Sequence, residues 1–83
     1  MRAKTAVEVW NAIASGYDSA AFTFEPFADW ICRYCSIGEG EQVLDVGCGT
    51  GISTLVAARF VGSSGSAIGI DPADQMVELA KRK

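Results

Sequence analysis

One short stretch, residues 43–51, holds most of the residues whose types and spacing could do chemistry. It begins with β-branched and aliphatic residues typical of a strand, carries an acid at Asp45, and continues into glycines at alternate positions. The glycines are Gly47, Gly49 and Gly51. The next segment, 52–61, places its apolar residues on one helical face. Strand, glycine loop and helix form a nucleotide site in α/β proteins, because the loop amides and the helix N-terminus converge on the ligand.

The glycine spacing argues against two familiar nucleotide sites. A dinucleotide fingerprint, G-x-G-x-x-G, requires its third glycine where this chain has Ile52. The loop also lacks the Gly-Lys-Ser/Thr of a phosphate-binding P-loop. Asp45 precedes the first glycine by two residues, where a carboxylate would not attract a pyrophosphate but would attract a ligand ammonium group. We therefore expect a ligand that carries a cation.

A second carboxylate, Asp71, follows the next apolar run, Ala67 to Ile70. A carboxylate at the end of a neighbouring strand can accept two hydrogen bonds from a ribose diol. Alternatively, Asp71 is the N-cap of the last helix, with Pro72 at the first helical position. A nucleoside without phosphates, joined to a cationic amino-acid tail, describes S-adenosylmethionine.

Helices and strands around the loop must position these residues. The apolar periodicity predicts helices over about 6–14, 25–36, 52–61 and 72–83, and strands over 42–46 and 67–70. Ser15-Gly16 is expected to end the first helix, with a loop over residues 17–20. Strand, helix and strand at this spacing predict a right-handed βαβ unit, in which the two strands are parallel neighbours.

An aromatic stripe marks the second predicted helix. It consists of Phe27, Trp30, Ile31 and Tyr34, at helical spacing. We expect this stripe, like the tryptophans in general, to pack as core against the sheet. The alternative is that the N-terminal helices form a lid over the glycine loop and help to shape a substrate pocket.

Composition sets limits on the class of protein. The chain has 83 residues, enough for one small domain, with 49% hydrophobic and 20% charged residues. A net charge of −3 without a basic stripe gives no indication of a nucleic-acid partner. No apolar run approaches the ~20 residues of a membrane span, and the N-terminus does not resemble a signal peptide, so we expect a cytoplasmic protein.

Three cysteines and no histidine do not make a zinc site. Cys32 and Cys35 form a C-x-x-C pair late in the second predicted helix, where we expect two small, half-buried thiols and no metal.

The sheet predicted from this sequence is incomplete. Both strands are nearly all apolar, which is typical of parallel strands covered on both faces within a larger sheet. Two strands alone are marginally stable and expose unpaired backbone edges. We therefore expect one partial domain, in which residues 1–41 are a helical segment and 42–83 a βαβα cofactor-binding unit. A missing C-terminal part or a partner chain would complete the sheet.

The stretch 43–51, followed by residues 67–73 and Met76, resembles the first two sequence motifs of class I S-adenosylmethionine-dependent methyltransferases. The resemblance implies a Rossmann-like three-layer α/β sandwich, of which this chain would contain the N-terminal helices and the first βαβα unit of the parallel sheet. The lead-in Tyr17-Asp18 is similar to that of small-molecule enzymes of the ubiquinone/menaquinone-biosynthesis type.

The resemblance also implies roles for the matching positions. Asp45 would orient the methionine ammonium, the glycines would let the backbone approach the methionine part, and Asp71 would hold the ribose hydroxyls. Pro72 and Met76 would pack near the adenine, and Tyr17 would close over the amino-acid tail. The expected cofactor-binding residues are Tyr17, Asp45, Gly47, Cys48, Gly49, Gly51, Asp71, Pro72 and Met76.

Each of these positions has a structural alternative. Asp45 could cap loop amides, the glycines could serve only a tight turn, and Tyr17 and Met76 could simply pack.

The resulting hypothesis is a methyltransferase fragment that binds S-adenosylmethionine and acts on a small-molecule acceptor. No general base can be assigned, and in the family the later strands supply most of the acceptor pocket, so we expect the 83 residues alone to be inactive. The alternatives are a non-catalytic S-adenosylmethionine-binding module, a nonfunctional fragment, and a nicotinamide-dependent oxidoreductase with an irregular glycine loop.

Overall fold

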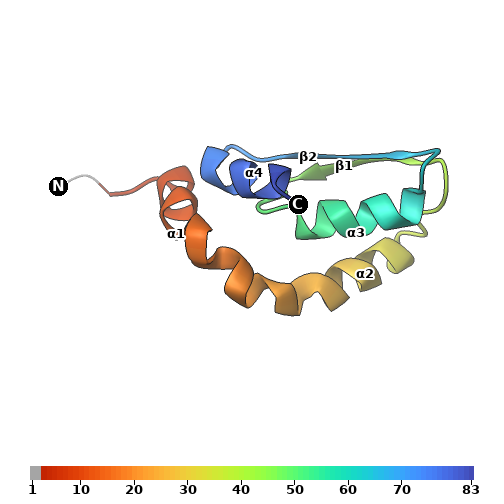
Figure 1. Cartoon of the computed structure of the whole chain (residues 1–83), viewed down its shortest axis with the longest axis horizontal. Coiled ribbons are helices and arrows are strands. Elements are labelled where there is room, and N and C mark those ends of the chain that lie inside the picture. Colours follow the sequence, from red (N-terminus) through yellow and green to blue (C-terminus); the bar gives the residue numbers. More distant parts are fainter. Residues whose placement is uncertain (1–2) are drawn as a thin grey trace.

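The computed structural model describes residues 3–83, with the side chains of residues 20–22 left out. Its elements, in chain order, are α1 (Ala6–Ala21), the short 3-10 helix η1 (Phe22–Phe24), α2 (Glu25–Tyr34), β1 (Gln42–Val46), α3 (Ile52–Val61), β2 (Ser66–Ile70) and α4 (Asp74–Lys81). The molecule is elongated, with extents of 49 × 22 × 21 Å, and α1, η1 and α2 form a continuous arm along its length (Figure 1).

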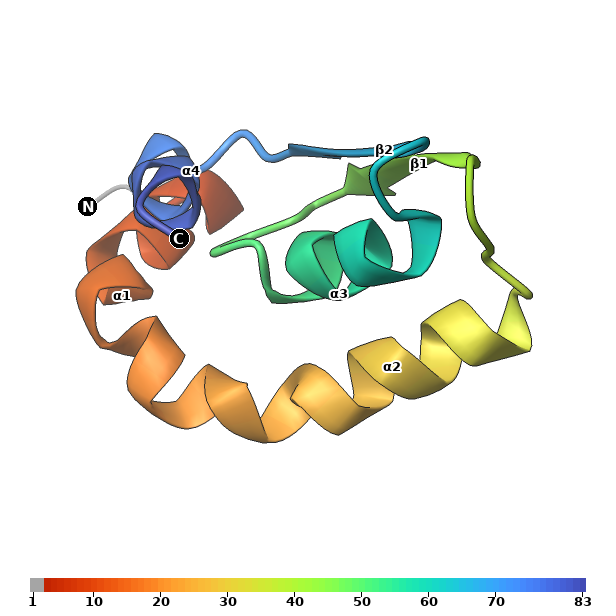
Figure 2. The ribbon, with the colours of Figure 1, turned by 45° about the vertical axis from the view of Figure 1, so that its right-hand side comes forward.

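The two strands form a parallel sheet, and α3 connects them as the βαβ pattern predicts. Val43 pairs with Ala67 and Asp45 with Gly69, so the carboxyl ends of both strands lie at the same edge. The helix α3 lies against one face of the sheet, and α2 covers the far side of α3 (Figure 1). At the other end of the molecule α1 packs against α4 (Figure 2). The α/β class and the bounds of β1 and α3 are confirmed.

The predicted end of the first helix is wrong. Helix α1 begins with a capping box between Thr5 and Glu8, continues through Ser15-Gly16 and reaches Ala21, so residues 17–20 are helical and not a loop. A glycine inside a helix costs only about 1 kcal/mol relative to alanine. Tertiary packing on both sides of Gly16 offsets that cost, because Ala14 is buried against α4 and Tyr17 packs beside it. The predicted bounds of α2, β2 and α4 differ from the observed ones by at most two residues, and the start of α2 and the end of β2 agree.

The aromatic stripe does not pack in the core, which corrects the expectation from its periodicity. Its side chains are between 53% and 77% exposed, and Trp30 and Tyr34 stack on each other with ring centroids 5.3 Å apart. The buried face of α2 carries Ala28 and Cys32, which pack with Val56 and other residues of α3. Small residues let two helix backbones approach closely, so α2 buries this face in place of the aromatic one.

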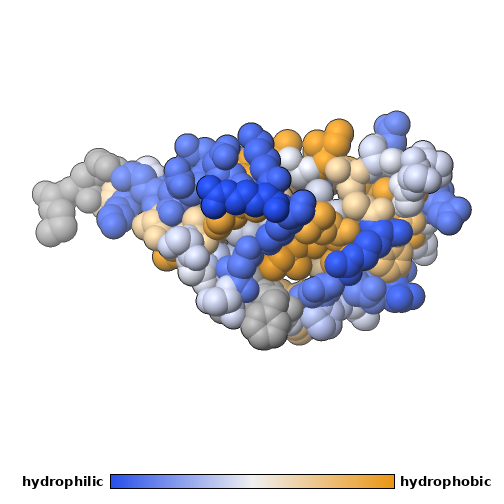
Figure 3. All heavy atoms as spheres, viewed as in Figure 1, coloured by the Kyte–Doolittle hydropathy of each residue, from blue (hydrophilic) through white to orange (hydrophobic). Residues whose placement is uncertain are grey.

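The sheet is covered on one face only. Val43 and Ala67 contribute to the core beneath it. The alternate residues point to the opposite face and are exposed: Leu44, Val46, Ile68 and Ile70. Figure 3 shows apolar side chains at the upper side of the molecule, over the strands. The expectation that a longer domain or another chain covers this face stays a prediction.

The two cysteines of the C-x-x-C pair differ in burial, with Cys32 buried and Cys35 exposed, and both are free thiols. Within residues 3–83, no group of His, Cys, Asp and Glu side chains could hold a metal ion. In the same part of the chain no helix combines the length and apolar character needed to cross a bilayer.

Gly69 fixes how closely β2 approaches the loop and α3. A Cβ at this position would lie 2.7 Å from both the Cβ of Cys48 and the Oγ1 of Thr54. These atoms belong to the glycine loop and to the first turn of α3. A larger residue at position 69 would therefore displace the loop or this helix.

We expect Gly69→Ala to lower the free energy of unfolding by about 1–3 kcal/mol, because an added methyl group overpacks this contact. Urea unfolding followed by circular dichroism measures the change. Gly16→Ala is the matched control, since a Cβ there meets nothing within 4 Å and a helix interior favours alanine. Equal stability of Gly69→Ala and the parent would contradict the packing described here.

Candidate functional site

The glycine loop is anchored by its backbone to the end of β2. The N–H groups of Gly47 and Cys48 both donate to the carbonyl oxygen of Ile70, at 2.8 and 3.0 Å. These bonds turn the chain sharply after β1 and hold the loop at the carboxyl edge of the sheet.

The three loop glycines differ in what surrounds them. All have positive φ angles, +77° at Gly47, +56° at Gly49 and +86° at Gly51, where side chains are strained. A Cβ at Gly47 or Gly49 would meet no atom within 4 Å, whereas one at Gly51 would lie 3.1 Å from the Cβ of Ala80 in α4. The first two glycines therefore present bare backbone to open space, and the third allows close packing of α4.

Asp45 is half-buried at the end of β1 and is bonded to α3. Its Oδ2 accepts a hydrogen bond of 2.7 Å from the hydroxyl of Thr54 in the first turn of that helix. The alternative that Asp45 caps loop amides is therefore wrong. Its other carboxylate oxygen accepts no hydrogen bond from the described residues, so a ligand ammonium could use it.

Asp71 bridges the loop and the start of α4. Its Oδ2 accepts from the N–H of Gly49 at 2.9 Å, and its Oδ1 from the N–H of Ala73 at 2.8 Å. The N-cap position of α4 belongs to Ala73, so the alternative that Asp71 is the N-cap is wrong. Each carboxylate oxygen has a second lone pair, so a ribose hydroxyl could still donate to Asp71.

The remaining predicted residues divide between the surface, the core and a pocket. Pro72 is exposed next to Asp71. Met76 is only 2% exposed and packs with Ala14 and Ala73, as the packing alternative describes; contact with an adenine stays a prediction. Tyr17 is half-buried, edge-on to Trp10 with ring centroids 6.0 Å apart, and it also lines the pocket beside the loop.

That pocket, of about 250 Å³, lies between the glycine loop and the helical arm. Its lining residues are Tyr17, Phe24, Phe27, Ala28, Ile31, Gly47, Cys48, Gly49, Thr50, Ile52 and Ser53. Two of the four stripe residues, Phe27 and Ile31, are therefore beside the loop. The helical arm therefore lies beside the glycine loop, and its role as a lid over a substrate pocket stays a prediction.

Cys48 contributes a buried thiol to the loop. Burial raises the pKa of this thiol, and the nearby carboxylates of Asp45 and Asp71 raise it further. Burial also raises the pKa of Cys32, with a smaller contribution from Asp29. A protonated thiol is a poor nucleophile, so Cys48 fits packing at the loop rather than covalent chemistry.

One residue of the site, Thr50, was not predicted from the sequence. Thr50 lies between two of the motif glycines and is 1% exposed, and its hydroxyl donates to the carboxylate of Asp18 in α1 at 2.6 Å. The signal was a lone hydroxyl residue inside a glycine loop, but its partner is 32 residues away and could not be inferred from spacing.

We expect iodoacetamide to alkylate Cys35 before Cys32 and Cys48 in the folded protein, because the thiolate is the reactive form and burial disfavours it. The raised pKa means that alkylation of Cys48 increases only at a pH above the ordinary thiol range. Peptide mass spectrometry after timed labelling at several pH values measures this order. Labelling of Cys48 as fast as Cys35 at about pH 8 would contradict the buried, protonated thiol.

Comparisons with known proteins agree with this geometry. Residues 6–83 match the family model described as protein-L-isoaspartate(D-aspartate) O-methyltransferase. A demethylmenaquinone methyltransferase of Lactococcus lactis is 37% identical over 92% of this chain and 32% of its own length, and one of Tropheryma whipplei is 35% identical over 92% and 33%. A probable cobalt-precorrin-6B C(15)-methyltransferase of Saccharolobus solfataricus is 46% identical over 55% of this chain and 23% of its own length.

No solved structure matches the chain. The chain spans about a third of the length of the demethylmenaquinone methyltransferases that it matches. The family match covers nearly all of it, including both strands, the glycine loop and the two carboxylates. The chain therefore belongs to the protein-L-isoaspartate(D-aspartate) O-methyltransferase family and, with it, to the class I S-adenosylmethionine-dependent methyltransferases.

Proposed function

We propose that this chain is the cofactor-binding part of a methyltransferase that uses S-adenosylmethionine and acts on a small-molecule acceptor. One observation carries the proposal. The bare backbone of Gly47 and Gly49 faces open space between two carboxylates, Asp45 and Asp71, at the ends of adjacent parallel strands.

This arrangement fits the chemistry of the cofactor. The oxygen of Asp45 that is not bonded to Thr54 is available to the methionine ammonium, and the spare lone pairs of Asp71 are available to the ribose hydroxyls. The absence of side chains at Gly47 and Gly49 leaves room for the methionine part. Pro72, exposed beside Asp71, would lie near the adenine.

When bound, S-adenosylmethionine supplies a methyl group activated by its sulfonium. The contribution of the protein is then to orient the two reactants and to exclude water. In this chain the glycine loop and its two flanking carboxylates would orient the cofactor, and the helical arm would cover the pocket beside the loop. No side chain of this chain is assigned as a general base.

Two observations favour a small, apolar acceptor. The relatives are named for demethylmenaquinone and a cobalt-precorrin, whereas the family model is named for an isoaspartate in protein. The pocket beside the glycine loop is lined on the arm side by Phe24, Phe27 and Ile31. Because the chain spans only about a third of those demethylmenaquinone relatives, we expect weak or no turnover from the 83 residues alone.

Titration calorimetry with S-adenosylmethionine, S-adenosylhomocysteine and NAD tests the cofactor. We expect both adenosyl sulfur compounds to bind and NAD to bind much more weakly, because Asp45 faces a cation in the former and a pyrophosphate in the latter. Preference for NAD would favour the oxidoreductase alternative. Adenosyl binding without methyl transfer by a chain extended to the length of the relatives would favour the non-catalytic binding module.

We expect Gly49→Val to abolish binding of S-adenosylhomocysteine, because its side chain would occupy the open space over the loop. Valine is also strained at the positive φ of this position. Gly40→Val is the matched control, since Gly40 has a φ of +82° and is not among the residues lining the loop pocket. Titration and urea unfolding of both variants separate the two effects. If Gly49→Val binds like the parent, the cofactor site lies elsewhere.

A further inference from the structure

A polar cluster of Thr50, Asp18 and Lys83 joins the glycine loop to α1, and the proposed cofactor contacts do not explain it. Among the residues whose burial the structure describes, Thr50 is the one buried polar side chain. Its hydroxyl donates to Oδ1 of Asp18 at 2.6 Å, which connects the loop to α1. A buried hydroxyl without a partner is destabilising, so this bond ties the conformation of the loop to the position of α1.

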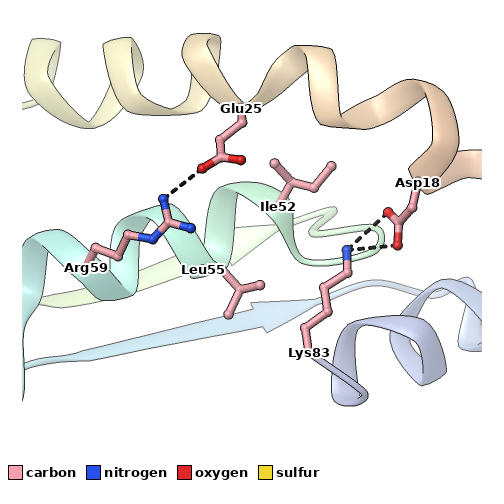
Figure 4. Close-up of a pocket in the computed structure, with 6 residues that line it drawn as sticks. All are labelled: Asp18, Glu25, Ile52, Leu55, Arg59 and Lys83. Carbon is pink, nitrogen blue, oxygen red and sulfur yellow. Dashed lines mark hydrogen bonds and ion pairs between the residues drawn. The ribbon is translucent and has the colours of Figure 1, made fainter.

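Lys83 completes the cluster. Its Nζ lies 3.1 and 3.0 Å from the two carboxylate oxygens of Asp18 and donates to the backbone carbonyl of Thr50 at 2.7 Å. Figure 4 shows Asp18 and Lys83 pointing toward each other across one end of a cavity of about 270 Å³. Burial alone would raise the pKa of Asp18, but the hydrogen bonds from Thr50 and Lys83 outweigh it and lower that pKa, so the carboxylate stays charged.

Asp18 and its neighbour Tyr17 line two different cavities near the glycine loop. Tyr17 lines the pocket beside Gly47 and Gly49, whereas Asp18 lines the cavity that also contains Lys83. Both lie within α1, so the bond from Asp18 to Thr50 also fixes where Tyr17 stands relative to the loop.

We propose that Asp18 is a positioning residue, which acts through Thr50 to hold the glycine loop in its cofactor-binding conformation and to keep Tyr17 against the loop pocket. The inference rests on the proposed function. It adds a residue that does not touch the cofactor but determines the shape of the surface that does.

A second ion pair provides a control from the same cavity. At its other end Arg59 of α3 pairs with Glu25 of α2 at 2.7 Å, with side chains that are 67% and 46% exposed (Figure 4). This pair also joins the helical arm to α3 but contacts no residue of the glycine loop. Removing this ion pair tests whether any polar link between the helical arm and α3 affects cofactor affinity, or only the link through Thr50.

The experiment compares five variants of the 83-residue chain. Thr50→Val removes the hydroxyl at nearly constant volume, Thr50→Ser retains it, and Asp18→Asn removes the charge. The double variant Asp18→Asn/Thr50→Val tests coupling, and Glu25→Gln is the control. For each variant, calorimetry gives the dissociation constant for S-adenosylhomocysteine, urea unfolding gives stability, and amide hydrogen exchange reports on the loop N–H of Gly51.

We expect Thr50→Val and Asp18→Asn each to weaken binding about tenfold, because the first removes the hydroxyl donor and the second replaces its charged acceptor with a weaker amide oxygen. Because both act on the same link, the double variant should bind no more weakly than the single variant with the lower affinity. Exchange of the Gly51 amide should accelerate in these variants. Thr50→Ser and Glu25→Gln should bind within about twofold of the parent, since one retains the hydroxyl and the other removes an exposed ion pair.

Parent-like affinity of both Thr50→Val and Asp18→Asn overturns the proposal. A parallel loss of affinity and stability in all variants, Glu25→Gln included, also overturns it, because the role is then general stability. If the parent itself does not bind S-adenosylhomocysteine, the proposed function fails and the exchange data decide this inference. Faster exchange at Gly51 in Thr50→Val and Asp18→Asn, but not in Glu25→Gln, then supports it, and unchanged exchange refutes it.

Discussion

The attachment of the glycine loop to the end of β2 is the constraint on which the rest of the structure depends. Two loop amides donate to the carbonyl of Ile70, and a third, that of Gly49, donates to the carboxylate of Asp71. These bonds take the place of the backbone hydrogen bonds between β1 and β2, which end where the chain turns away after β1. They also bring Asp71 to the loop and aim the bare backbone outward.

Close packing beneath the loop keeps that attachment in place. Gly69 lets β2 approach Cys48 and Thr54, and Thr54 in turn bonds Asp45. Each site carboxylate therefore has a structural partner as well as a predicted ligand. Because Asp71 already accepts two backbone hydrogen bonds, a ribose must share this carboxylate or displace the amide of Gly49.

Local sequence signals predicted the part of the fold around the loop. The bounds of β1 and α3 follow from apolar runs and glycines next to them in the chain. The end of α1 did not follow, because the small cost of Gly16 is offset by packing of Ala14 against a helix far away in sequence. Periodicity located the two faces of α2 but could not decide whether the aromatic side or the side with Ala28 would be buried.

In the candidate site, too, residues within local motifs could be predicted, whereas contacts between distant segments could not. The two carboxylates and the glycines lie within motifs of fixed spacing, so the sequence could indicate them. The bond between Thr50 and Asp18 depends on the path of α1 across the loop, and no local pattern specifies that path. The bridging of Asp71 to Gly49 and Ala73 likewise required the structure.

The most direct test of the central claim is a two-dimensional amide NMR titration of the chain with S-adenosylhomocysteine. If the cofactor binds over the loop and beside Asp71, the largest shift changes fall on the amides of Gly47, Gly49 and Ala73, two of which donate to that carboxylate. Saturable shift changes confined to other parts of the chain, with these amides unmoved, would contradict the account.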